Sequence, residues 1–141
     1  MAKALNVAEY ILSKYGKMSA WKLQKLVYYS QAWNLVWDDV PLFDDEIQAW
    51  ANGPVVRSLY ACHRGQFIVT TVDGDKNKLS TAEKETIDLV YGHYGDKTAK
   101  YLSDLTHLEE PWIVARKGVP DGVRSEKEIT QASMHEYYSA I

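Results

Sequence analysis

The chain has 141 residues, a length typical of one domain, and 46% of them are apolar, which is enough for a hydrophobic core without disulfides or metals. Its net charge of −3 argues against a nucleic-acid binder that works by bulk positive charge. No apolar run reaches the roughly 18 residues of a membrane span, and the single cysteine, Cys62, excludes an internal disulfide and fits a reducing cytoplasm.

Two helices are predicted at the start of the chain. Apolar residues recur at intervals of three and four over residues 2–15, which predicts a helix that ends at Gly16. Ser19 is a suitable N-cap for a second helix over residues 20–37.

The helix over residues 20–37 carries apolar side chains on both sides. A helix of this kind is usually surrounded by others, so we expect it to be the central, buried helix of the domain. Its expected structural residues are Leu23, Leu26, Tyr29 and Trp33.

The middle of the chain is harder to interpret. Residues 43–51 fit either a short strand or an irregular edge. Proline is favoured at the first position of a helix, so Pro54 predicts a helix that extends to about His63. The β-branched residues of Gln66–Val72 are consistent with another short strand, and an exposed turn follows.

The remainder of the chain is predicted to be helical. Ser80 and Glu83 form a capping box, which opens a helix at about residues 81–93. Further helices are expected at about residues 97–107, from Pro111 to before Gly118, and at 130–140. The predicted fold is therefore one compact, mainly α-helical domain over residues 1–141, with at most a small β-hairpin on the rim.

Three polar residues, Lys22, Gln24 and Lys25, lie at the start of the apolar helix. The N-terminal end of a helix carries partial positive charge, so lysines there are locally unfavourable. Either carboxylates from neighbouring helices neutralise them, or they face the acidic surface of a partner.

The segment Trp50-Ala-Asn52-Gly53-Pro54-Val55 raises a similar pair of alternatives. If a helix begins at Pro54, its free N–H groups can receive an anion or a carboxylate of a partner. Otherwise Asn52 caps this helix and Trp50 packs beneath it.

Neither a metal site nor a catalytic centre is predicted. His107 and Glu109 are two candidate ligands without a third, and we expect no metal and no cofactor. Instead Thr106 and His107 should close one helix, where His107 can hydrogen-bond a buried carbonyl or a side chain of the helix over residues 20–37. Pro111 and Trp112 should open the next helix. Cys62 and its helix neighbour His63 point in different directions, so Cys62 is expected to be a small buried residue.

Taken in order, a series of short motifs resembles the Panacea domain family, which includes SocA-like antitoxins and phage-associated GepA-like proteins. The motifs are Met18-Ser19, Lys22-Leu-Gln-Lys-Leu26, Tyr28-Tyr29, Pro41-Leu-Phe43, Ile47-Gln-Ala-Trp50, Gly53-Pro-Val-Val56, Tyr60, Leu102-Ser103, Thr106-His107, Pro111-Trp112, Ile129 and Tyr137-Tyr138. The resemblance implies a helical domain that neutralises a toxin encoded beside it by direct binding. It also implies, for the SocA branch, delivery of the toxin to a AAA+ protease.

The leading hypothesis is thus a cytoplasmic antitoxin whose partner is a toxin from an adjacent gene, with no membrane or nucleic-acid partner. Ten Tyr and five Trp agree with a protein-binding role, because both residue types are enriched at interfaces. Expected anchors, besides the two segments above, are Arg57, Tyr60 and Arg64. The alternatives are a proteolytic adaptor and a small enzyme built on His107, Glu109 or Cys62.

Overall fold

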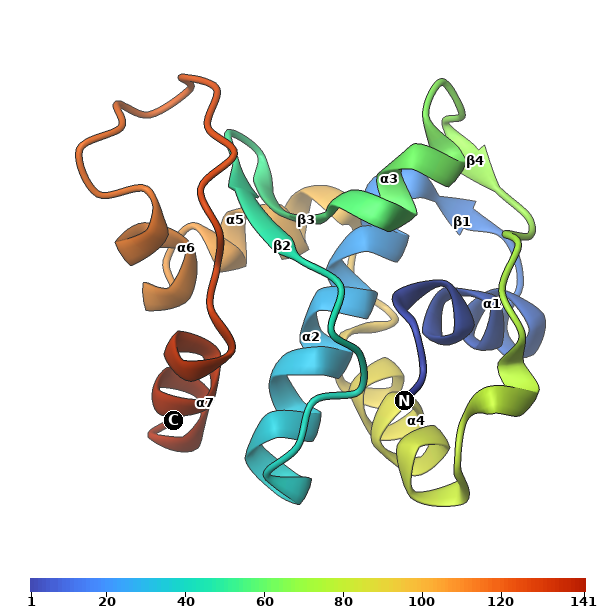
Figure 1. The fold of residues 1–141 in the computed structure, drawn as a ribbon. Helices are drawn as coiled ribbons and strands as arrows, with labels where there is room; N and C mark the ends of the chain where they lie inside the picture. The colour runs from blue at the N-terminus through green and yellow to red at the C-terminus, as the bar shows by residue number, and fades with distance from the viewer.

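The computed structural model describes all 141 residues and is mainly α-helical (Figure 1). The seven α-helices are α1 (Ala4–Tyr15), α2 (Ala20–Asp38), α3 (Arg57–His63), α4 (Thr81–Tyr94), α5 (Ala99–Thr106), α6 (Glu110–Ala115) and α7 (Gln131–Ser139). The short strands are β1 (Met18–Ser19), β2 (Ile47–Trp50), β3 (Gly53–Val56) and β4 (Ile68–Val69), and a 3-10 turn, η1, spans Lys76–Lys78. No helix is long and apolar enough to cross a membrane.

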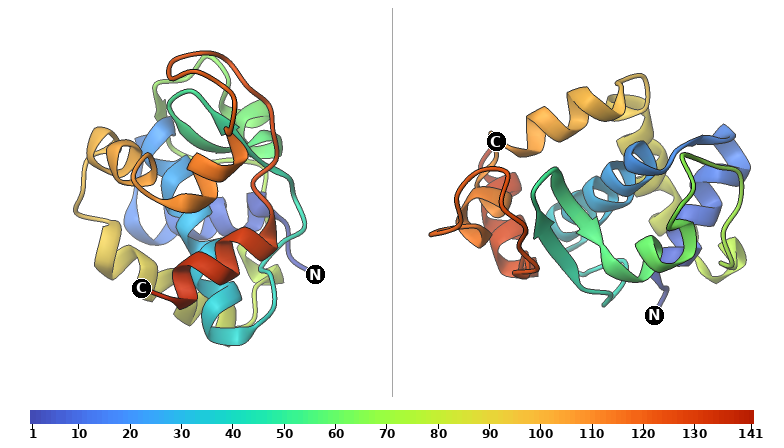
Figure 2. Two further views of the ribbon diagram at one scale, coloured as in Figure 1. Left: turned by 90° about the vertical axis from the view of Figure 1, so that its left-hand side faces the viewer. Right: turned by 90° about the horizontal axis from the view of Figure 1, so that it is seen from above.

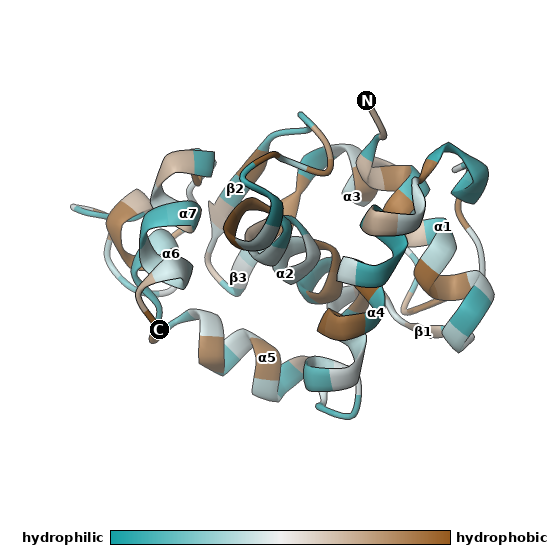
Figure 3. Cartoon of the chain, turned by 90° about the horizontal axis from the view of Figure 1, so that it is seen from below, coloured by the Kyte–Doolittle hydropathy of each residue, from teal (hydrophilic) through white to brown (hydrophobic).

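Helix α2 packs against most of the other elements. It contacts α1, α3, α4, α5 and α7 as well as β1 and β3. In Figure 3 it lies in the middle of the domain, with α6 and α7 to its left, α1 and α4 to its right and α5 below it. Thirteen of its nineteen residues are buried, including the polar side chains of Gln24, Lys25, Gln31 and Asn34. A helix buried all round must satisfy its polar groups inside the protein.

Four buried side chains form a polar cluster between α2, the start of α6 and α7. The Glu109 carboxylate oxygen Oε1 accepts hydrogen bonds from the hydroxyls of Tyr29 at 2.7 Å and Tyr138 at 2.8 Å. The hydroxyl of Tyr28 lies 3.0 Å from that of Tyr138. Burial raises the pKa of the Glu109 carboxyl, although both hydrogen bonds oppose this effect. The cluster therefore joins three helices through one acceptor atom.

Strands β2 and β3 form an antiparallel hairpin that corrects the prediction for this segment. Pro54 pairs with Ala49 inside the hairpin, and α3 begins only at Arg57. The predicted helix start at Pro54 is wrong, and Asn52 is a turn residue instead of a helix cap. Proline is tolerated here because the N–H group that it lacks is not needed at this position of the hairpin edge.

The hairpin was expected on the rim, but seven of its eight residues are buried. On one side, β3 contacts α2 and α5. On the other side, the segment before α7 bonds to β2, since the Ala49 N–H donates to the Lys127 carbonyl and the Ile129 N–H donates to the Ile47 carbonyl. Figure 2 (right) shows the hairpin between α3 and the α6–α7 region.

The other helices lie where the sequence predicts them, and none of their ends differs by more than two residues. The capping box at Ser80 and Glu83 is present. Two of the residues expected as a short strand, Ile68 and Val69, pair with Ser19 and Met18, which makes a second two-stranded sheet.

Candidate partner-binding groove

Gln24 is buried and connects α2 to the hairpin. Its Oε1 accepts from the Val56 N–H at 2.8 Å, and its Nε2 donates to the Val56 carbonyl at 3.2 Å. The same Nε2 lies 2.9 Å from Nε2 of His63 in α3. Burial lowers the pKa of His63, so its neutral ring is the form that accepts this hydrogen bond. Gln24 is therefore placed as a structural link and has no exposed surface in this structure.

Lys25 is also buried, with only 1% of its surface exposed. Its Nζ donates one hydrogen bond, to the Pro54 carbonyl at 3.3 Å. No carboxylate forms an ion pair with Lys25 or with Lys22, so the first of the two alternatives, neutralisation by carboxylates of neighbouring helices, is wrong. Burial lowers the pKa of Lys25 to about 8.

Gly53 is needed for this arrangement. Its φ of +124° lies outside the range that other residues adopt readily, and a Cβ atom there would lie 2.7 Å from Cε of Lys25. Together, Gly53 and the Pro54 carbonyl hold the lysine side chain between α2 and the hairpin turn.

A groove of about 430 Å³ opens beside this lysine, between α2, the hairpin, α3 and the loop after α6. Its lining combines aromatic and basic side chains. The residues are Trp21, Trp50, Ala51, Asn52, Val55, Arg57, Tyr60, Arg64, Gly122 and Arg124. The Tyr60 ring packs edge-on against Trp50, with centroids 4.8 Å apart, and lies 6.3 Å from Trp21. We call this the basic aromatic groove.

The basic aromatic groove has an excess of positive charge. Arg57 pairs with Glu126 at 3.2 Å, and Arg124 is 3.8 Å from the same carboxylate oxygen. Arg64 forms no ion pair. Two of the three guanidinium groups of the groove thus share one carboxylate and the third has none, on a protein whose net charge is −3. Such a surface favours an acidic segment of a partner.

The comparisons with known proteins identify the domain. The sequence model of the family described as "Antitoxin SocA-like, Panacea domain" matches residues 23–113, which is well over half of the chain. The chain belongs to the SocA-like Panacea family. No significant match is found among curated proteins or solved structures.

The Panacea domain brings together five of the predicted partner-binding residues: Trp50, Asn52, Arg57, Tyr60 and Arg64 line the basic aromatic groove. Gly53 and Pro54 are buried beneath it, and Lys22 is half-buried outside its lining. Three lining residues, Trp21, Gly122 and Arg124, were not predicted. Trp21 shares a helix face with Lys25, a spacing that sequence reasoning can detect, whereas Arg124 comes from a loop with no sequence signal.

The residues proposed for an enzyme do not converge in this Panacea domain. Cys62 is exposed, so the prediction that it is buried is wrong. His107 caps the end of α5 and stacks on Trp112 with centroids 4.1 Å apart, but its buried Nε2 has no hydrogen-bond partner, contrary to expectation. Glu109 instead faces the tyrosine cluster, and no group of three potential metal ligands occurs.

The other predicted structural residues are mostly inaccessible. Those buried are Leu23, Leu26, Tyr29, Thr106, Pro111 and Trp112, and Trp33 is half-buried.

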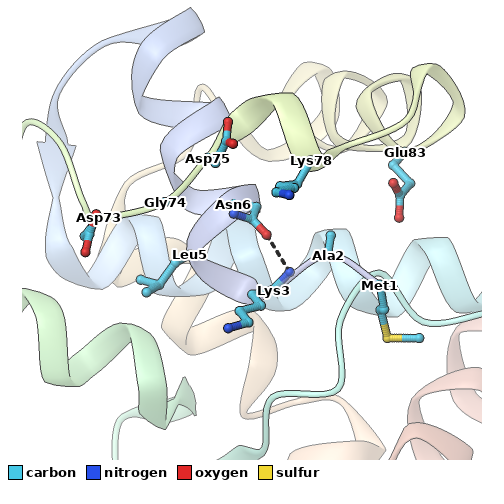
Figure 4. Close-up of a pocket in the computed structure, with 10 residues that line it drawn as sticks. All are labelled: Met1, Ala2, Lys3, Leu5, Asn6, Asp73, Gly74, Asp75, Lys78 and Glu83. Carbon is cyan, nitrogen blue, oxygen red and sulfur yellow. Dashed lines mark hydrogen bonds between the residues drawn. The ribbon is translucent and has the colours of Figure 1, made fainter.

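A second large cavity, of about 960 Å³, lies between the start of α1 and η1 (Figure 4). Its charged side chains have both signs: Lys3 and Lys78 against Asp73, Asp75 and Glu83. Because the charges are mixed and only three of its ten lining residues are hydrophobic, this cavity lacks the bias toward one class of ligand that the basic aromatic groove shows.

Proposed function

We propose that this Panacea domain is an antitoxin that acts in the cytoplasm and binds its toxin directly through the basic aromatic groove. Membership of the family supports the antitoxin role. The observation that carries the choice of surface is the combination of three arginines with Trp21, Trp50 and Tyr60 in one groove. Tyr, Trp and Arg are the residues that most often dominate the energy of protein interfaces.

The mechanism that follows is occlusion. An acidic segment of the toxin lies in the groove, and the domain covers or distorts the toxin's active site. A stable interface of this kind buries roughly 1,600 Å² in total, which is larger than the groove alone, so contacts extend onto neighbouring surfaces. We infer that α2, around which the other helices are arranged, acts as the rigid support of this surface.

The test is co-expression with the product of the adjacent gene. We expect growth rescue and a complex that survives affinity purification, and we expect Arg64→Glu to abolish both. Lys78→Glu is the matched control, because it changes the charge by the same amount on an exposed residue outside the groove. Loss of rescue in both variants, or in neither, would contradict the assignment of the groove.

An adaptor role makes a different prediction. A toxin delivered to a AAA+ protease has a shorter half-life when antitoxin and protease are both present, whereas an occluded toxin is as long-lived as the complex. No feature of the fold favours delivery over occlusion, so occlusion is the mechanism that we propose.

A further inference from the structure

The ammonium group of Lys25 lacks a counter-charge inside the domain. Lysine has three N–H donors, and here the structure provides one acceptor, a carbonyl at the long distance of 3.3 Å, besides the face of the Trp21 ring, whose centroid is 5.7 Å from Nζ. Buried charges in proteins are normally paired and fully hydrogen-bonded, because an unpaired charge loses its hydration without compensation. Lys25 is the only lysine that is buried.

A small cavity of about 220 Å³ borders this lysine. It lies between the start of α2, the turn of the hairpin and the start of α5, and no acidic residue lines it. The lining residues are Trp21, Lys25, Asn52, Ala99, Lys100 and Ser103. Lys100 forms an ion pair with Asp104 at 2.8 Å, so Lys25 is the lysine of this cavity whose charge is unpaired.

The cavity adjoins the basic aromatic groove. Trp21 and Asn52 line both spaces, so they form the boundary between them. The Asn52 carbonyl accepts a hydrogen bond from the hydroxyl of Ser103, which fixes the hairpin turn against α5. A segment bound in the groove therefore lies next to the cavity.

We propose that this cavity is a carboxylate-binding subsite, in which an Asp or Glu side chain of the toxin pairs with Lys25. The inference rests on the proposed function and specifies which chemical group of the partner is recognised. Trp21 and Ala99 provide apolar walls for the methylene stem of the acidic side chain. One unpaired ammonium matches a single negative charge, and a charge-assisted hydrogen bond would supply the acceptor that the free domain lacks.

Zero-length cross-linking of the full-length complex tests this assignment. A carbodiimide activates a carboxyl group, and an amine within reach displaces the activating group as a urea and forms an amide bond. With toxin from the adjacent gene bound, mass spectrometry should find Lys25 joined by an amide to an Asp or Glu of the toxin. Cross-links from Lys22 or Lys100 alone would contradict the subsite.

Affinity measurements give a second, independent result. Lys25→Met keeps most of the length of the side chain but removes its charge, and should raise the Kd by at least about tenfold. Lys78→Met is the control and should leave the Kd within about twofold, because Lys78 is exposed and lines neither the groove nor this cavity. If the wild-type domain binds and neutralises the toxin while Lys25→Met binds equally well, the subsite is refuted and the proposed function stands. If the wild-type domain binds no protein encoded by an adjacent gene, both the subsite and the proposed function are refuted.

Discussion

Replacing Lys25 by methionine should leave the stability of the free domain unchanged or increase it. Methionine has a similar length and no charge, so it can follow the same path past Gly53 without requiring a counter-ion. If Lys25 served only to stabilise the fold, its replacement would lower the stability of the domain, since most substitutions of buried residues destabilise a protein.

The magnitude follows from two opposing effects. Burial lowers the pKa of Lys25 from 10.5 to about 8. At about 1.4 kcal/mol for each pKa unit, holding this side chain charged at neutral pH costs roughly 3 kcal/mol of folding free energy. Removing it also leaves the Pro54 carbonyl without its donor, which costs about 1–3 kcal/mol. The expected change on substitution at pH 7 is therefore between zero and about 2 kcal/mol of added stability.

The pH dependence gives the sharper test. Below pH 8, Lys25 is protonated in both the folded and the unfolded chain, and the full cost of burying its charge applies. Between pH 8 and 10.5 the folded chain has released this proton and the unfolded chain still holds it, so the stability of the wild-type domain rises relative to that of the variant. His63 and His107 lie near the ammonium, but burial lowers the pKa of both, so they titrate below this window.

The assay is urea unfolding of the wild-type domain and Lys25→Met at several pH values from 7 to 10. The unfolding free energy of the wild-type domain should rise relative to that of Lys25→Met by about 3 kcal/mol between pH 8 and 10, so any advantage of the variant at pH 7 is lost and then reversed. A variant that is less stable by more than about 3 kcal/mol at pH 7, or a difference that does not change with pH, would refute the reasoning.

Four further predictions concern other parts of the fold. Glu109→Gln should be at least as stable as the wild type at pH 7, because an amide can still accept from both tyrosine hydroxyls without a buried charge; Glu109→Ala should lose about 2–5 kcal/mol in urea unfolding. Gly74→Ala should destabilise the domain by about 1–3 kcal/mol, since a methyl group would overlap the Leu5 carbonyl. Gly92→Ala, on an open face of α4, should instead stabilise it by about 0.5–1 kcal/mol. A thiol reagent should modify the exposed Cys62 in the folded protein, and protection until unfolding would contradict this placement.

Local signals in the sequence account for most helix boundaries but not for the site. Ser19 and Ser80 cap their helices as predicted, because an N-cap depends only on residues a few positions away. Pro54 misled the prediction, since a proline is compatible with a helix start and with a strand edge, and only the pairing with Ala49 decides between them. The burial of Lys25 depends on a hairpin turn that lies 28 residues further along the chain, at Gly53, and no local pattern encodes that contact.

The two ends of α2 differ in whether the chain supplies a partner of opposite charge for their unfavourable charges. Both carry charges of the wrong sign for the helix dipole: lysines at the N-terminal end and aspartates at the C-terminal end. At the C-terminal end, Asp39 lies 2.9 Å from Nε2 of His135 in α7, so the chain supplies a partner. At the N-terminal end, Lys25 has a carbonyl and an open cavity, and no carboxylate of the chain reaches it. The fold thus leaves an unfavourable charge unpaired beside the basic aromatic groove, and a partner that supplies the counter-charge is the simplest explanation. For this reason we place the recognition of the toxin at the N-terminal end of α2.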